Sequence, residues 1–269
     1  MKLEGKVAIV SGGGGIGQGI VRCLAEEGAD VAVIDIKEES ANIAANEVKK
    51  LGRRSLALTA DMTDSKDVGQ VVKNIIDTFG KIDILVNNVG GHGEAYWGGT
   101  SLRFVDQEEA EWDQDLSVNL KTQVLMSRAV VPYFIKQNSG KIINMSSIGG
   151  KRGAPGNMTY GAAKAAVLHF TKSLALELAG YNVNVNAICP GVLFTPLLAR
   201  GIAHRIPFIP EAKGMTAREY FNKSTLSRVP LKREQTPEDI GRAVVFLVSE
   251  DAKNITGQSL NVDGGLIMD

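Results

Sequence analysis

The sequence has little of what marks secreted, metal-binding or nucleic-acid-binding proteins. Its 269 residues include only two cysteines, Cys23 and Cys189, and three histidines, and neither set has the spacing of a disulfide framework or a zinc site. Basic and acidic side chains are equal in number, 30 of each, so the overall charge does not favour nucleic acid or an anionic membrane. We therefore expect no metal, no nucleic-acid or membrane partner, and a small molecule as the ligand.

The chain also lacks long apolar runs and low-complexity segments. It contains no stretch of about 18 apolar residues that could span a bilayer, and no basic-then-apolar leader precedes its first apolar run. It also has no internal repeat and no Pro/Gly/Ser-rich linker. These absences predict a cytoplasmic protein with a single domain over residues 1–269.

What is present is an alternation of two hydrophobic periods. Short β-branched runs predict buried parallel strands at 7–10, 31–34, 56–58, 82–86, 141–145 and 183–188. Between them, apolar residues recur every three or four positions, which predicts helices at 16–27, 38–51, 65–79, 111–137 and 159–178. This order predicts an α/β fold of the Rossmann type, a doubly wound parallel sheet with helices on both faces.

Residues 194–228 interrupt the alternation, because they contain no clear strand. A connection of this length inside a compact domain is usually functional. We therefore predict that this segment, called the lid below, is inserted to cover a substrate.

A glycine-rich turn lies directly between the first predicted strand and the first predicted helix. Glycines there let backbone N–H groups approach a pyrophosphate at the positive end of a helix. The candidate residues for this contact are Ser11, Gly12, Gly14, Gly15, Ile16 and Gly17. A flexible turn is the alternative, but the flanking strand and helix favour dinucleotide binding.

Asp35 ends the second predicted strand, 18 residues beyond Gly17. A carboxylate at this place can accept hydrogen bonds from the adenosine ribose hydroxyls and would repel a 2′-phosphate, which favours NAD over NADP. The nearby Lys37 leaves NADP as an alternative. Asp35 could also be a solvated carboxylate that caps the helix beginning near Glu38.

Tyr160 and Lys164 are four residues apart in a predicted helix, so both side chains lie on one face. The pair alone is weak evidence, and its context is Ser147 just after a predicted strand and Asn119 within the predicted helix 111–137. With Asn87-Asn88-Val89-Gly90 and Pro190-Gly191, these residues make the chain resemble the short-chain dehydrogenase/reductase family from about residue 4 to residue 265.

This resemblance implies that Tyr160 donates or accepts a proton, that Ser147 holds the substrate oxygen and that Asn119 maintains a water-linked proton relay. The chemistry agrees, because an alcohol must lose a proton as hydride leaves its carbon. A phenol with a pKa near ~10 is a poor base at neutral pH, so a neighbouring Lys164 cation and the positive nicotinamide ring would favour the phenolate.

The resemblance also implies further cofactor contacts. Lys164 would bind the nicotinamide ribose together with Tyr160, Asp61 would contact the adenine, and Val192 and Thr195 would approach the carboxamide. Other residues implied to line the cofactor path are Ile36, Met62, Asn88, Gly90, Pro190 and Gly191. Each has a plain alternative: Asp61 as a turn former, Asn88 as a loop amide and Thr195 as a helix cap before Pro196.

The glycine turn departs from the family pattern. The family's turn reads Thr-Gly-x-x-x-Gly-x-Gly, whereas Ser11 and Gly17 are one residue too close for it. The glycines also satisfy the Gly-x-Gly-x-x-Gly spacing at Gly12, Gly14 and Gly17. The register that the phosphates contact is therefore open.

The composition of the lid suggests a substrate class. Six basic residues face two acidic ones there, which could attract an anionic substrate or could be a solvated helix face. Its apolar residues could cover a hydrophobic substrate body, and His92, Tyr96 and Trp97 could form another wall.

Three functions stay open at this stage. The first is an NAD-dependent oxidoreductase that interconverts a secondary alcohol and a ketone, with Tyr160 as general acid or base. The second is an NADP-dependent 3-oxoacyl-thioester reductase. The third is a catalytically idle cofactor-binding subunit, suggested by the shortened turn. The family resemblance further implies a homotetramer built through 111–137, 159–178 and the C-terminal segment.

Overall fold

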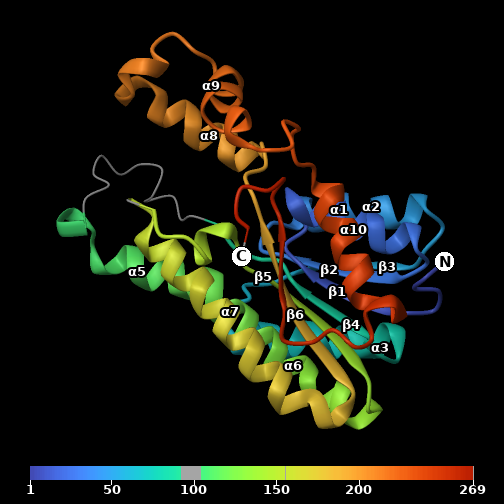
Figure 1. Cartoon of the computed structure of the whole chain (residues 1–269). Coiled ribbons are helices and arrows are strands. Elements are labelled where there is room, and N and C mark those ends of the chain that lie inside the picture. Colours follow the sequence, from blue (N-terminus) through green and yellow to red (C-terminus); the bar gives the residue numbers. More distant parts are fainter. Residues whose placement is uncertain (92–103, 155, 269) are drawn as a thin grey trace.

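The computed structural model describes residues 1–91, 104–154 and 156–268, which form a seven-stranded parallel sheet flanked by helices (Figure 1). The strand order is β3-β2-β1-β4-β5-β6-β7, and every neighbouring pair is parallel. The strands are β1 (Val7–Ser11), β2 (Asp30–Asp35), β3 (Ser55–Thr59), β4 (Ile84–Asn87), β5 (Gly140–Met145), β6 (Val183–Pro190) and β7 (Ser259–Val262).

The predicted doubly wound fold is thus confirmed. All six predicted strands are present, although β4 begins at Ile84 instead of residue 82, and the edge strand β7 was not predicted. Strand order reverses between β1 and β4, and in open α/β sheets ligands bind at the carboxyl ends of strands beside such a reversal. The sheet therefore places the ends of β1, β4 and β5 where a cofactor would be expected.

Alternate residues of each strand face two separate hydrophobic cores. On β1, Ala8 and Val10 face the core beneath α1, α2 and α10, whereas Ile9 faces the core beneath α3, α6 and α7. This explains why the strands read as continuous apolar runs. The helices are α1 (Ile16–Glu26), α2 (Glu38–Lys50), α3 (Ser65–Phe79), α5 (Glu109–Leu116), α6 (Thr122–Gln137), α7 (Met158–Leu178), α8 (Pro196–Arg205), α9 (Ala217–Ser224) and α10 (Pro237–Val248).

Helices α1 and α10 cross so closely that their backbones touch. A Cβ added to Gly19 would lie 2.3 Å from the carbonyl carbon of Pro237. A Cβ on Gly241 would lie 2.5 Å from the Gly19 oxygen and 2.7 Å from Cys23 Sγ. Only glycine permits this approach, which fixes α10 against the helix that starts at the glycine turn.

The predicted helix 111–137 is wrong in one respect, because it is not continuous. α5 ends at Leu116, a π-helical turn follows at Ser117–Lys121, and α6 begins at Thr122. The π-helical turn contains Asn119, which is completely buried. Such turns are rare and are found mostly at functional sites, and this one rotates Asn119 relative to a regular helix.

The lid contains no strand, as predicted, but it is largely helical. Figure 1 shows α8 and α9 together beyond the main body of the molecule. Thr195 caps α8, with its side chain accepting a hydrogen bond from Leu198 N at 3.3 Å, and Thr216 caps α9 in a reciprocal arrangement with Glu219. Phe221 of α9 is buried against Phe194, with ring centroids 5.0 Å apart.

Candidate active site

The glycine turn is fastened to the end of β4. Ser11 Oγ accepts a hydrogen bond from Asn88 N at 3.0 Å, and Asn88 Nδ2 donates to the Gly12 oxygen at 2.9 Å. The alternative of Asn88 as a loop amide is therefore partly correct, since its side chain holds the turn. These bonds join the ends of β1 and β4 at the reversal point.

The inner side of the turn is tightly packed and its outer side is open. A Cβ on Gly17 would lie 1.9 Å from the Gly12 oxygen, and one on Gly13 would lie 2.8 Å from the Ser40 oxygen. At Gly14, by contrast, an added Cβ would meet nothing within 4 Å among the described residues. Gly14 therefore marks the side of the turn from which a ligand can approach.

The start of α1 suits an anion. Within the described ranges, no side chain caps this helix, and its first turn contains no acidic residue. Its first amide groups are thus directed toward the turn with the positive end of the helix dipole behind them. A dinucleotide pyrophosphate fits this arrangement of open backbone and uncapped helix start.

Asp35 lies beside the turn and contacts it directly. One carboxylate oxygen accepts a hydrogen bond from Gly13 N at 2.8 Å, and the other accepts one from Lys37 N at 2.9 Å. A carboxylate has about four acceptor positions, so both oxygens can also accept from ribose hydroxyls. The next residue, Ile36, is 63% exposed and offers an apolar surface at this edge.

The predicted catalytic residues converge at two glycines. A Cβ on Gly149 would lie 3.4 Å from Ser147 Oγ and 3.5 Å from Tyr160 Cε1. A Cβ on Gly90 would lie 2.6 Å from Lys164 Nζ and 2.8 Å from Asn119 Oδ1. The structure thus brings Ser147 close to Tyr160 and Lys164 close to Asn119. Tyr160 and Lys164 are one turn apart on α7, which links the two pairs.

Lys164 is a buried lysine without a carboxylate at ion-pair distance among the described residues. Its side chain is 2% exposed, and its Nζ donates to the Met145 oxygen at 2.9 Å and lies 5.6 Å from the centroid of the Tyr160 ring. Burial lowers the pKa of Lys164 to about 8, against the opposing influence of Cys189 and Asp115. The ammonium form of Lys164 therefore predominates at neutral pH, but the pKa lies only about one pH unit above neutrality.

Asn119 clamps the loop that follows β4. Its Oδ1 accepts from Gly91 N at 2.8 Å, and its Nδ2 donates to the Gly91 oxygen at 2.9 Å and to the Asp115 oxygen at 3.0 Å. Gln123, one turn later, donates from Nε2 to the Asn119 and Met145 oxygens, each at 3.0 Å. Gln123 thereby connects Asn119 to the carbonyl that holds Lys164.

The remaining predicted cofactor residues lie along the carboxyl ends of the strands. Asp61 accepts from both the N–H and the hydroxyl of Thr63, which lowers the pKa of its carboxyl group, so the turn-forming alternative is realised. Met62 is buried. Pro190 ends β6, and Gly191 N donates to the oxygens of Val262 and the Gln235 side chain. Val192 follows, and Thr195 caps α8.

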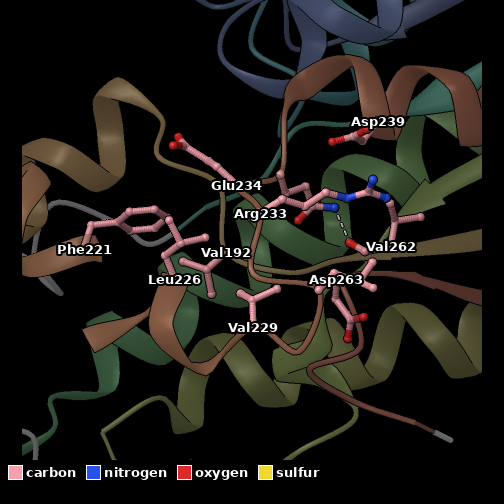
Figure 2. A pocket seen from close by; sticks show the side chains of 12 residues that line it. Val192, Phe221, Leu226, Val229, Arg233, Glu234, Asp239, Val262 and Asp263 are labelled. Atoms are coloured by element: carbon pink, nitrogen blue, oxygen red, sulfur yellow. Dashed lines mark hydrogen bonds between the residues drawn. The ribbon is translucent and has the colours of Figure 1, made fainter. Parts of the chain in front are cut away.

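A cavity of about 160 Å³ lies between the lid and the C-terminal segment (Figure 2). Val192, Phe221 and Leu226 form its apolar side, while Arg233, Glu234 and Asp263 are among its polar residues. None of Asn119, Ser147, Tyr160 and Lys164 lines this cavity, whereas Val192, one of the predicted cofactor contacts, does. The predicted pocket wall of His92, Tyr96 and Trp97 lies outside the described residues.

Two residues close to the site were not identified from the sequence. Asp115 and Gln123 flank Asn119 at a distance of four residues on either side, and both are buried. Their spacing from Asn119 was visible in the sequence, but a regular amphipathic helix would not predict which of its polar residues point inward. No group of three or more metal-ligating side chains occurs within the described ranges.

Comparisons with known proteins agree with this geometry. A family model described as enoyl-(acyl carrier protein) reductase matches residues 10–267. The 3-oxoacyl-(acyl-carrier-protein) reductase FabG of Thermotoga maritima is 37% identical over 269 residues, which is the full length of both chains. Oxidoreductase UcpA of Salmonella typhimurium is 37% identical over 267 residues, covering 98% of this chain and 95% of the relative.

Solved structures show the same likeness. A structure of NAD⁺-bound xylitol dehydrogenase superimposes with a TM-score of 0.89 at 30% identity, covering 98% of this chain and 100% of that one. The chain is an NAD(P)-dependent oxidoreductase by fold and relatives. It belongs to the short-chain dehydrogenase/reductase family. No helix in the described ranges combines the length and apolar character needed to cross a membrane.

Proposed function

We propose that this protein is an NAD-dependent oxidoreductase that interconverts a secondary alcohol and a ketone, with Tyr160 as the general acid or base. The observation that carries this proposal is the convergence of Ser147 with Tyr160 at Gly149 and of Lys164 with Asn119 at Gly90. The open outer side of the glycine turn lies at the carboxyl ends of the same sheet, so a bound cofactor would lie next to the residues that transfer the proton.

Each of these side chains has a role that its contacts support. Ser147 Oγ accepts a hydrogen bond from Gly149 N at 3.0 Å, so its hydroxyl hydrogen is directed elsewhere and can be donated to the substrate oxygen. Tyr160 takes the alcohol proton or returns it to a ketone, and the Lys164 ammonium favours the phenolate form. When bound, the nicotinamide dinucleotide supplies the two-electron acceptor or donor.

Asp35 supports NAD as the preferred cofactor. Its two carboxylate oxygens are held in place by Gly13 N and Lys37 N, so the negative charge is fixed beside the adenosine end of the turn. A 2′-phosphate would bring two further negative charges to the same place. The NAD⁺-bound xylitol dehydrogenase neighbour is consistent with this preference, whereas the FabG relatives favour the alternative below.

The second candidate is an NADP-dependent 3-oxoacyl-thioester reductase. The relatives named 3-oxoacyl-(acyl-carrier-protein) reductase favour it, since one of them matches the whole chain. The lid supports an anionic substrate less than its sequence suggests. Arg218 stacks 3.7 Å above the Phe194 ring and pairs with Glu234 at 2.6 Å, so it braces the lid.

We further propose that the chain forms a homo-oligomer, a tetramer in keeping with the sequence prediction. α7 buries one face against the sheet but also presents apolar residues to solvent on its other faces. Leu176 is 83% exposed, and the exposed Ala162 and Ala165 would permit close helix packing. Analytical ultracentrifugation at micromolar concentration tests this, and a monomer there contradicts it.

A paired titration and turnover assay tests the proposed function. We expect saturable NADH binding, followed by cofactor fluorescence, that is at least about 10-fold tighter than NADPH binding. A panel of secondary alcohols with NAD⁺, and 3-oxoacyl thioesters with both reduced cofactors, then identifies the substrate class. Tyr160→Phe is the control, because it should bind NADH normally and turn over nothing.

The outcomes separate the candidates. Faster thioester reduction with NADPH than with NADH would reverse the reading of Asp35 and favour the second candidate. Failure to bind either cofactor would leave the third possibility from the sequence, an idle subunit of the same fold.

A further inference from the structure

The helix α5 buries an acidic residue and exposes an apolar one. Asp115 is the buried residue of this helix, at 4% exposure, whereas the adjacent Leu116 is 37% exposed. Aspartate is almost never fully buried unless it is paired, because removing an unpaired carboxylate from water is strongly unfavourable. An apolar side chain would satisfy packing alone, so the buried carboxylate calls for another explanation.

The contacts of Asp115 lead directly to the candidate catalytic residues. Its Oδ2 accepts a hydrogen bond from Thr159 Oγ1 at 2.6 Å, and Thr159 immediately precedes Tyr160 in the first turn of α7. This distance is typical of a hydroxyl bonded to an ionised carboxylate. The backbone oxygen of Asp115 accepts from Asn119 Nδ2 at 3.0 Å. One residue of α5 thus touches both the start of α7 and the π-helical turn.

Asp115 also lies near Lys164, because the Asn119 side chain that donates to the Asp115 oxygen approaches the same point beside Gly90 as Lys164 Nζ does. Among the described residues, the titratable groups near this ammonium are Cys189 on β6, Asp115 on α5 and Tyr160 on α7, whose ring centroid lies 5.6 Å from Nζ. Burial lowers the pKa of Lys164, and Asp115 opposes that shift. Cys189 is a buried thiol, so Asp115 is the member of this group that brings a full negative charge at neutral pH.

We propose that Asp115 is a positioning residue of the active site: through Thr159 it fixes the start of α7, and with it Tyr160, and it places a carboxylate near the buried Lys164. The inference rests on the proposed function, in which Tyr160 and Lys164 act together. It extends the site by a residue on α5 that the four predicted catalytic positions do not include.

Asp115→Asn separates the charge from the hydrogen bond. The asparagine oxygen can still accept from Thr159, so the start of α7 should stay in place while the negative charge is lost. Lys164 should then lose its proton at lower pH, because a nearby negative charge favours the ammonium form and this substitution removes it. In turnover, the alkaline limb of the kcat profile should move by the same amount, with the NADH Kd unchanged.

Thr159→Val removes the hydrogen bond and leaves the carboxylate. It should lower kcat about 10-fold across the pH range while leaving the NADH Kd within about twofold, and Thr159→Ser should restore kcat. Thr122→Val is the matched control, because Thr122 is also buried and donates to Val118 within its own helix region. It removes a buried hydroxyl of the same kind, whose hydrogen bond is accepted by Val118 and not by a residue of α7.

The protonation of Lys164 is measured directly by NMR on protein with lysine labelled at Cε with carbon-13, using Lys164→Met to assign the signal. This measurement needs no substrate, so it tests the inference even if the proposed reaction is wrong. An unchanged Lys164 titration in Asp115→Asn overturns the electrostatic half of the proposal. Equal loss of kcat in Thr159→Val and Thr122→Val overturns the positioning half.

If Asp115→Asn does not fold alone, the double variant Asp115→Asn/Lys164→Met decides the question. The proposal expects Lys164→Met to restore folding, because the double variant no longer holds a buried ammonium group without its counterpart. A double variant that is still unfolded overturns the electrostatic half of the proposal.

Discussion

Gly14 and Gly17 lie three residues apart in the same turn, yet the structure assigns them different tasks. Gly17 is needed for packing, because a methyl group there would lie 1.9 Å from the Gly12 oxygen and would have to retreat by more than ~1 Å to reach an ordinary contact. Gly14 has open space on the corresponding side. Replacing each by alanine therefore tests folding and ligand approach separately.

For Gly17→Ala we expect a net loss of about 2 kcal/mol in unfolding free energy. Overpacking against a backbone atom falls at the upper end of the usual penalty, ~3 kcal/mol, and the better helix propensity of alanine offsets ~1 kcal/mol. In a chain of this size the loss corresponds to a fall in Tm of roughly 4–8 °C.

For Gly14→Ala we expect stability within ~0.5 kcal/mol of the unmodified protein, because nothing obstructs the methyl group. NADH binding should nevertheless weaken by about 10-fold or more, since the methyl group stands where the pyrophosphate would approach. Urea unfolding and cofactor fluorescence measure the two effects. A Gly14→Ala protein that binds NADH normally would refute the assignment of the open side, and a fully stable Gly17→Ala would refute the packing argument.

Further predictions follow from burial and charge. Lys164→Met should abolish turnover but raise the unfolding free energy at pH 7 by about 1–3 kcal/mol. The burial that lowers the Lys164 pKa from 10.5 to about 8 costs the folded state roughly 3 kcal/mol, and methionine avoids this cost. The loss of the hydrogen bond to the Met145 oxygen offsets part of the gain. Since the unfolded chain holds more protons between these two pKa values, the unmodified protein should gain stability from about pH 8 to about pH 10.5, and Lys164→Met should lose this slope in urea titrations. Burial raises the pKa of the Cys23 thiol to about 11, so native protein at pH 8 should resist iodoacetamide at this position, and rapid labelling would contradict the packing of α1 on α10. Asp35→Asn should weaken NADH binding and lower the ratio of the NADPH Kd to the NADH Kd at least about fivefold in fluorescence titrations. An unchanged ratio of the two Kd values would show that Asp35 does not select the cofactor.

The alternating hydrophobic periods were sufficient to predict the architecture. Strands buried on both faces give continuous apolar runs, and β1, β2 and β6 could be recognised for that reason. β7 was missed because it is a short edge strand, mostly half-exposed, so its sequence carries neither an apolar run nor a clear alternation. The lid helices α8 and α9 were missed because each is short and partly exposed.

The candidate site was predictable as far as residue spacing could reveal it. Tyr160, Lys164, Ser147 and Asn119 stood out by type and position, and the fold brings them together. The π-helical turn at Ser117–Lys121 could not be predicted, because a helix with one extra residue in a turn has no sequence period of its own. Without it, the inward direction of Asp115 and Gln123 could not be foreseen either.

The close crossing of α1 and α10 also constrains how this protein can be recombined with its relatives. Gly19 and Gly241 are more than 200 residues apart in the sequence, yet each occupies space that the other's helix would otherwise fill. Replacing either glycine alone by a larger residue would create a clash between the two helices. A chimera that takes the first third of the chain from one parent and the last third from another therefore contains this clash unless both parents have glycine at both positions. Crossover libraries should therefore treat these two distant helices as one inherited block.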